Sequence, residues 1–460
     1  MWLFLLFSTA VVQATNISLT EDYFVSFVKK YPVKSICPCD DFYAHVCSAV
    51  PTGEMSYFHK SKRIFSLFNL DDYRQLKMQS ILEAMKEVFK SDEKNATDEA
   101  SVKDRVEQLN VTQAHNLKEC TNILTKTLVK LFSLDESLTV KLLETFKHIT
   151  DLHAFLRGLQ DPKNQKIKEQ FVLVQSKTEA MFDQIKKAYL ERIMASPWVH
   201  DRDLFDHYIS IAAVEFRSYF WNSGFEEFSE TVVRVYEKCA QLSFAWYKKE
   251  LLFCAIKAFT VAHEKANLPW FHQEGLDMNA AYINGDIAVM PTYMMVATYN
   301  EIASFAVLNF VVGHEVAHHI FADATNISTL MPENVECLKK HRAHVCNISS
   351  PKCWSGTITA VEDAPDVTSL AILTDLFNEA KHGFKMHPSL TMSKEKFLFY
   401  SMVADWCLPP DAVSWGNSHS RSKERMNSLL MHSKFFHETF ECKRGDKMWQ
   451  DPVGVYLLED

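Results

Sequence analysis

The strongest constraint on this fold is a largely apolar segment, residues 302–321, that carries two histidines and a glutamate in a fixed pattern. His314, Glu315 and His318 form the pattern HExxH among residues that are otherwise mostly apolar. We expect a buried helix from about Ile302 to Phe321, in which these side chains need partners. Residues four apart share one helical face, so both imidazoles can bind one metal ion. The alternative is a core helix with two hydrogen-bonded histidines.

The same pattern predicts a general base and a missing third ligand. Glu315 follows the first histidine and would lie beside a metal-bound water, whose proton it could take. A catalytic zinc site has three protein ligands and one open position. The metzincin pattern, in which a further histidine follows soon after through a glycine, is absent, because the chain continues HIFADATN. The third ligand is therefore expected from another segment.

The segment EDAPD at residues 362–366 is the candidate source. Glu362 could bind zinc, and Asp366, four residues later, could hold the far nitrogen of either histidine. Such a carboxylate orients the imidazole and fixes its tautomer. The alternative is a helix start capped by acids, since Asp363 and Pro365 are typical of that position.

The rest of the chain indicates a mainly α protein with a small β component. Helical spacing of apolar residues dominates residues 61–265, and glycine is scarce at 11 residues. Residues 279–290 contain Asn284-Gly285 between apolar stretches, which predicts a short hairpin. We predict an N-terminal segment at 15–60, a helical lobe at 61–265 and a C-terminal lobe at 266–460.

Several features predict export. Residues 2–12 are apolar but shorter than the roughly 20 residues that span a bilayer, and small residues precede a cleavage site after Ala14, which predicts a signal peptide at 1–14. The 11 cysteines include no CxxC pair and suit disulfides. Sequons for N-glycosylation occur at Asn16, Asn95, Asn110, Asn326 and Asn347. We expect a secreted, extracellular glycoprotein without a stable membrane span, and the net charge of −9 argues against nucleic acid as a partner.

Further motifs follow in order along the chain. They are CDDFYAHVC from Cys39, NAAY from Asn279, VVGHEVAHHIF, VEDAPD, FLFYSMVADWC, the pair His419 and Arg425, and FHETFECKRGDKM. This series resembles the neprilysin and endothelin-converting enzyme family of zinc metallopeptidases. The resemblance implies a two-lobed gluzincin fold, with a thermolysin-like catalytic lobe and a helical cap lobe that is reduced here.

The resemblance also implies roles for individual residues. One Zn²⁺ per chain would be bound by His314, His318 and Glu362, with Glu315 as the base and Asp366 as the orienting carboxylate. The peptide main chain would bind Asn279 and the backbone of Ala280, the oxyanion would bind His419, and a substrate carbonyl would bind Arg425. The implied disulfides are Cys39–Cys442, Cys47–Cys407 and Cys120–Cys239, and the first two tie residues 15–60 to the catalytic lobe.

Some positions depart from the family pattern. HHIFAD replaces HGFDD after the second zinc histidine, so Asp323 is displaced. Asn417 replaces an aspartate, Pro365 lies inside the ligand segment, and the family's closing CxxW is missing, which leaves Cys337 without its usual partner.

The sequence thus predicts a secreted zinc endopeptidase. It would hydrolyse oligopeptide substrates on the amino side of hydrophobic residues, by Glu-assisted attack of zinc-bound water. The alternative is a catalytically weak neprilysin-like protein that acts as a peptide- or protein-binding module.

Overall fold

The computed structural model describes residues 22–55, 155, 158–195, 212–218, 280–283, 286–321, 357–408 and 419–450. The chain divides into two compact units, and the larger one contains residues 18–61, 171–219 and 278–460. Everything described below lies in this larger unit, apart from the 3-10 helix η4 and the first residues of α8. The predicted domain boundaries stay predictions.

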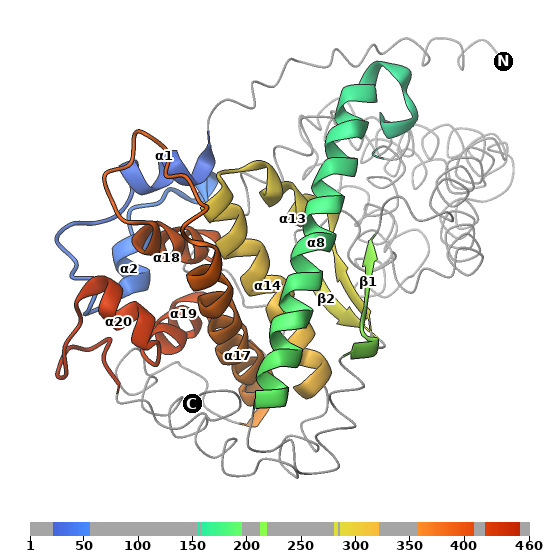
Figure 1. Ribbon diagram of the computed structural model, residues 1–460. Coiled ribbons are helices and arrows are strands. Elements are labelled where there is room, and N and C mark those ends of the chain that lie inside the picture. The colour runs from blue at the N-terminus through green and yellow to red at the C-terminus, as the bar shows by residue number, and fades with distance from the viewer. Residues whose placement is uncertain are drawn as a thin grey trace, which may run out of the picture. The chain divides into compact units, whose positions relative to one another are not determined.

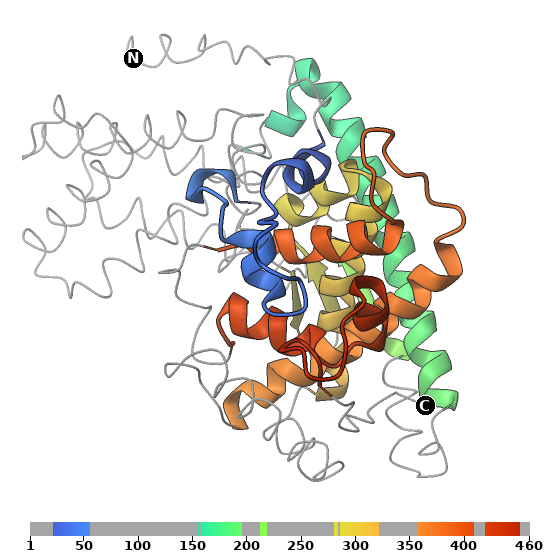
Figure 2. The ribbon, with the colours of Figure 1, turned by 90° about the vertical axis from the view of Figure 1, so that its left-hand side faces the viewer.

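The core of the larger unit is built around helix α14 (Glu301–Phe321), which the apolar pattern predicts almost to the residue. Helices α17 (Thr357–Ala380) and α18 (Lys394–Asp405) pack against it, as Figures 1 and 2 show. Nearly every residue of α14 from Ile302 to Ala317 is buried. An all-round apolar helix of this kind is stable only when other elements enclose it.

Helix α17 corrects one interpretation of the sequence. It begins at Thr357, so Asp363 and Pro365 lie in its interior and do not cap its start. Proline at this position removes one main-chain donor, yet the helix continues to Ala380. Because the helix is already formed at Glu362, that residue and Asp366 share one face. Pro365, which departs from the family pattern, therefore does not separate the carboxylates of Glu362 and Asp366.

A small sheet lies beside α14. Strands β2 (Ala280–Ile283) and β3 (Asp286–Val289) form the predicted antiparallel hairpin. Strand β1 (Glu215–Ser218) pairs with β3 in parallel, so the order is β1-β3-β2 and β2 is an edge strand. β1 falls in the segment 61–265, where helical spacing dominates, and the sequence analysis did not predict this strand.

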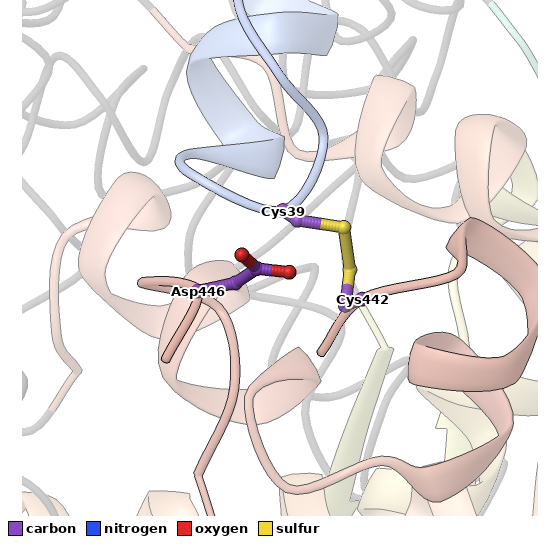
Figure 3. A group of neighbouring side chains, drawn as sticks. All are labelled: Cys39, Cys442 and Asp446. Carbon is purple, nitrogen blue, oxygen red and sulfur yellow. A yellow bond between two sulfur atoms is a disulfide. The ribbon is translucent and has the colours of Figure 1, made fainter. Parts of the chain in front are cut away.

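Two disulfides join the start of the described chain to its end. The structure forms Cys39–Cys442, shown in Figure 3, and Cys47–Cys407, both of which the resemblance implies. Asp446 lies near the first pair, but sulfurs bonded to each other are not thiolates and cannot bind a metal in that form. Cys120 and Cys239 lie outside the described residues, as do residues 1–21 and the sequons.

The other elements complete the packing. They are α1 (Tyr23–Lys30), α2 (Phe42–Cys47), η2 (Thr52–Glu54), η4 (Pro162–Asn164), α8 (Gln165–Ala195), α13 (Pro291–Met294), η6 (Met295–Thr298), α19 (Ser422–Leu430) and α20 (Lys434–Phe440). Helices therefore dominate the described residues around one small sheet, which confirms the predicted fold class. Among the described helices, none combines the length and apolar character needed to cross a membrane.

The crossing of α14 and α17 depends on one small residue. A Cβ atom added at Gly313 would lie 2.6 Å from Ser369 Oγ, and Tyr189 of α8 donates a hydrogen bond of 2.9 Å to the Gly313 carbonyl. We expect Gly313→Ala to lower the free energy of unfolding by about 1–3 kcal/mol, because the helices must move apart. Urea unfolding measures this. Ser369→Ala should restore part of the loss, whereas Gly383→Ala, in an exposed turn, should cost far less; equal losses at both glycines would contradict the close contact.

Candidate metal centre

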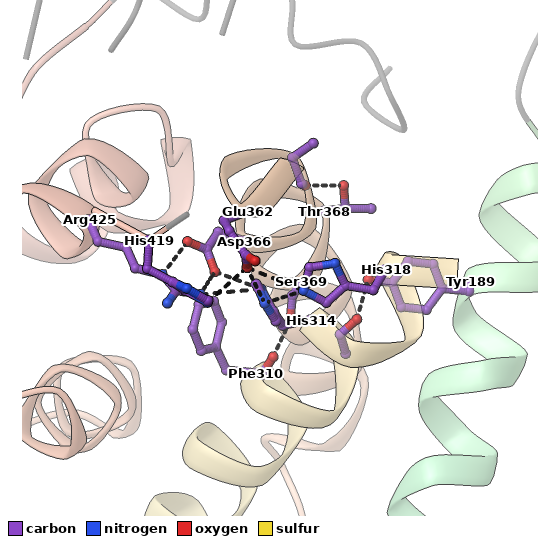
Figure 4. A network of polar contacts seen from close by, with 12 residues as sticks. Tyr189, Phe310, His314, His318, Glu362, Asp366, Thr368, Ser369, His419 and Arg425 are labelled. Carbon is purple, nitrogen blue, oxygen red and sulfur yellow. Dashed lines mark hydrogen bonds and ion pairs between the residues drawn. The ribbon is translucent and has the colours of Figure 1, made fainter. Parts of the chain in front are cut away.

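Three side chains from two helices converge at the end of α14. His314 and His318 project from α14 and Glu362 from α17, as Figure 4 shows. The two Nε2 atoms are 2.9 Å apart. Glu362 Oε2 lies 3.2 Å from Nε2 of His314 and 3.3 Å from Nε2 of His318. The resemblance implied this ligand set, and the structure brings it together.

These atoms fit a zinc ion. Tetrahedral zinc with bonds of about 2.0–2.1 Å separates its ligand atoms by roughly 3.3 Å, close to the distances found here. Glu362 Oε2 is buried and lies close to imidazole nitrogens, but none of these contacts has the geometry of a hydrogen bond. A buried carboxylate oxygen in that position requires a partner. Two imidazoles and one carboxylate are the donor set of many catalytic zinc sites.

A second carboxylate orients the first histidine. Asp366 Oδ1 lies 2.8 Å from His314 Nδ1, so Nδ1 is the donor and Nε2 is left for a metal. Burial opposes a charge on His314, but Asp366 and Glu362 outweigh it and raise its pKa to about 9. Of the two histidines considered for this contact, the structure selects His314.

Arg425 of α19 holds Asp366 in place. Its Nε and Nη2 lie 2.6 and 2.7 Å from the two oxygens of Asp366, a bidentate pair that is buried. Burial would raise the pKa of Asp366, but Arg425 and His314 hold it well below its usual range. The guanidinium carbon lies 4.3 Å from the ring centre of Trp406, a cation–π contact.

Glu315 is buried beside the ligands. The main-chain N–H of Tyr282 donates to its Oε2 at 2.8 Å. Burial raises the pKa of Glu315, while His314 and His318 oppose that rise. A carboxylate whose pKa is raised is a stronger base and is suited to accept a proton.

His419 completes the ring of groups around Glu362. It precedes α19, and its Nε2 lies 3.0 Å from Glu362 Oε2. Its side chain keeps 25% of its surface exposed, more than that of either histidine on α14. Burial opposes the charge of Glu362, but the three histidines lower its pKa far below the usual value.

Comparison with known proteins agrees with this geometry. Residues 279–454 match the model of peptidase family M13. The match confirms the family resemblance and supports a zinc metallopeptidase. A comparison with curated proteins gives no match.

One solved structure shares the fold with a TM-score above 0.5, and two others have lower scores. The "Haemonchus galactose containing glycoprotein complex" has 12% sequence identity and a TM-score of 0.56, with 93% of this chain and 97% of that chain covered. PepO from Lactobacillus rhamnosis has 15% sequence identity and a TM-score of 0.43. The match covers 61% of this chain and 46% of that chain. Zmp1 from Mycobacterium tuberculosis, in complex with inhibitor, has 13% sequence identity and a TM-score of 0.48. The match covers 75% of this chain and 58% of that chain. The chain thus spans about half the length of the last two.

The remaining predicted site residues have mixed outcomes. Ala280 lies in the edge strand β2, beside the site, and Asn279 lies outside the described residues. Arg425 is directed at Asp366, so its contact with a substrate carbonyl stays a prediction. The displaced Asp323, Asn417 and Cys337 are also outside the described residues.

Two contributors were missed by the sequence analysis. Tyr282 supplies the hydrogen bond to Glu315, and Trp406 packs on Arg425. Each belongs to a motif quoted for the resemblance, NAAY and FLFYSMVADWC, and this was the only signal in the sequence.

Proposed function

We propose that this chain is a secreted zinc endopeptidase that hydrolyses oligopeptides on the amino side of hydrophobic residues. The observation that carries the proposal is the convergence of His314, His318 and Glu362 beside a buried Glu315, within a segment that matches peptidase family M13. Zinc held there supplies Lewis-acid chemistry, since it polarises a carbonyl and lowers the pKa of water.

Glu315 is the proton carrier in this proposal. Tyr282 engages its Oε2, so Oε1 is the oxygen that takes a proton from the attacking water. The same carboxyl group then passes that proton to the nitrogen of the departing amine. Burial raises the pKa of Glu315, which makes the carboxylate a stronger base for the first step.

The edge of β2 is the proposed place for the substrate backbone. The N–H of Tyr282 points to α14, away from β3, so the main-chain groups of Ala280, two residues earlier, face the same outer edge. An extended peptide can pair with such an edge and present its scissile carbonyl to the ligands. His419 would then donate to the developing oxyanion, work that a fixed donor does well.

Secretion and one zinc per chain are parts of the same proposal. The apolar N-terminal run, the sequons and the two disulfides support an oxidising compartment. Among the described residues, the group of His314, His318 and Glu362 offers one place for an ion, which supports one zinc per chain.

The decisive experiment measures cleavage and metal content on one sample of the full chain. We expect a quenched fluorescent oligopeptide with one hydrophobic residue to be cut before that residue, with about one zinc per chain. A chelator should abolish the activity, and added zinc should restore it. The control is the same peptide with the hydrophobic residue replaced by aspartate.

Other outcomes have clear meanings. If the protein contains zinc but hydrolyses no peptide in a library of peptides with hydrophobic residues, the proposal of an endopeptidase is wrong. The alternative, a peptide-binding module, would then remain. If the folded chain takes up no zinc, both the proposed cofactor and the proposed enzymatic activity are wrong.

A further inference from the structure

Tyr282 contacts helix α14 at two points. Its main-chain N–H donates to Glu315 Oε2 at 2.8 Å, and its phenol oxygen lies 2.7 Å from His319 Nδ1. The rings of Tyr282 and His319 meet edge to face, with centroids 5.3 Å apart. Glu315 and His319 are four residues apart and share one helical face, so both contacts tie β2 to the same side of α14.

The attachment lies at the outer strand of the described sheet. β2 is an edge strand of four residues and pairs on one side with β3. An edge strand of this length has few ladder bonds to fix its distance from a neighbouring helix. The bond to Glu315 is made by the backbone of that strand, so a small shift of β2 would move the carboxylate or break the bond.

The Tyr282–His319 contact is not simple core filling. Both side chains are partly exposed, whereas most of α14 around them is buried. A polar pair with 2.7 Å between its atoms fixes both partners in direction as well as in distance.

We infer that Tyr282 is a positioning residue for the base Glu315, and that His319 acts through Tyr282. The pair holds β2 at the distance at which the Tyr282 N–H binds Oε2, and thereby aims Oε1 at the attacking water. The inference rests on the proposed function. It assigns to His319 a role that neither its neighbour His318 nor the ligand set requires.

Three substitutions test the contact between the Tyr282 hydroxyl and His319 separately from the main-chain bond to Glu315. Tyr282→Phe keeps the ring and the main-chain N–H but removes the hydroxyl. His319→Leu removes the acceptor or donor at Nδ1, and His319→Asn places an amide near the same position. We expect kcat to fall about 10-fold in the first two variants with KM changed by less than about twofold, because a misplaced base slows the chemical step. His319→Asn should recover most of kcat.

The matched control is another tyrosine–histidine pair of the same unit. The hydroxyl oxygen of Tyr400 lies 2.7 Å from His45 Nε2, away from the ligands. Tyr400→Phe removes the same atom from the same kind of contact, and kcat should stay within about twofold of wild type. The double variant Tyr282→Phe with His319→Leu should be no slower than either single variant, since the two residues form one contact.

A measurement without substrate tests the attachment directly. Hydrogen exchange of the peptide that contains residues 280–283 should be at least about threefold faster in Tyr282→Phe and His319→Leu, and unchanged in Tyr400→Phe. Zinc content should be that of wild type in all of them. Unchanged kcat and exchange in active, zinc-loaded variants would overturn the inference, and so would additive losses in the double variant. An inactive wild type would instead overturn the proposed function, while the exchange result would still decide whether the attachment exists.

Discussion

Replacing Glu315 by glutamine is expected to lower kcat by about 10²–10⁴-fold while the protein keeps its zinc. The amide has nearly the same shape and can still accept the hydrogen bond from the Tyr282 N–H, so β2 should stay in place. It cannot accept a proton from water, because an amide oxygen is a very weak base. The ligands His314, His318 and Glu362 are untouched by the change.

The control for this variant lies on the same helix. Glu301 is exposed in the first turn of α14, and Glu301→Gln removes the same charge far along the chain from the ligands. Its kcat and zinc content should equal those of wild type. If Glu315→Gln hydrolyses peptides at the wild-type rate, Glu315 is not the base, whatever the metal content.

The sequence predicted the local part of the site well. Three residues of the HExxH pattern lie within one helical turn, so the spacing alone places His314 and His318 on one face of α14. The helix and the β2–β3 hairpin follow from apolar spacing and from the Asn284-Gly285 turn signal. In these segments, contacts between sequence neighbours determine the geometry.

The long-range part could not be derived from spacing. Glu362 lies on another helix, and its approach to His314 depends on how α14 and α17 cross, which in turn requires the small Gly313 opposite Ser369. The capping alternative for Pro365 fitted the sequence equally well and was wrong because the helix begins eight residues earlier, at Thr357. Only the family resemblance selected the correct interpretation.

The same limit explains the missed strand and the missed contacts. Strand β1 pairs in parallel with β3, a partner far along the chain, so its four residues show no signal of their own. Tyr282 acts on Glu315 through its backbone, which every residue type possesses. A tyrosine at this position therefore gives no direct indication of that bond.

The network behind His314 links these distant elements into one unit. Trp406 of the segment after α18 packs on Arg425 of α19, Arg425 binds Asp366 of α17, and Asp366 holds His314 of α14. Each member is buried or nearly so, and each charge has a partner, which such burial requires. The disulfide Cys47–Cys407 closes the chain next to Trp406. The orientation of one ligand thus depends on residues from four segments.

Removing the carboxylate of Glu362 should abolish zinc binding at concentrations that saturate the wild type. In Glu362→Gln the ligand oxygen belongs to a neutral amide, a far weaker donor to zinc, and two histidines alone leave the ion with too few protein ligands. We expect zinc affinity to fall by more than about 100-fold, beyond the range typical for the loss of an orienting group. Hydrolysis should be lost with it. Equilibrium dialysis against buffered zinc measures the affinity.

Thermal unfolding with and without zinc distinguishes lost binding from lost folding. Binding to the native state stabilises it, so wild type at 100 times its dissociation constant should gain about 2.7 kcal/mol, and Glu362→Gln should gain almost nothing. The control is Asp375→Asn, on the same helix, whose carboxylate pairs with Arg192 and lies outside the ligand group. It should bind zinc as wild type does. If Glu362→Gln folds, binds zinc tightly and is stabilised by it, then the third ligand is another residue, and the convergence of Glu362 Oε2 with three histidines is an ion-pair cluster without a metal.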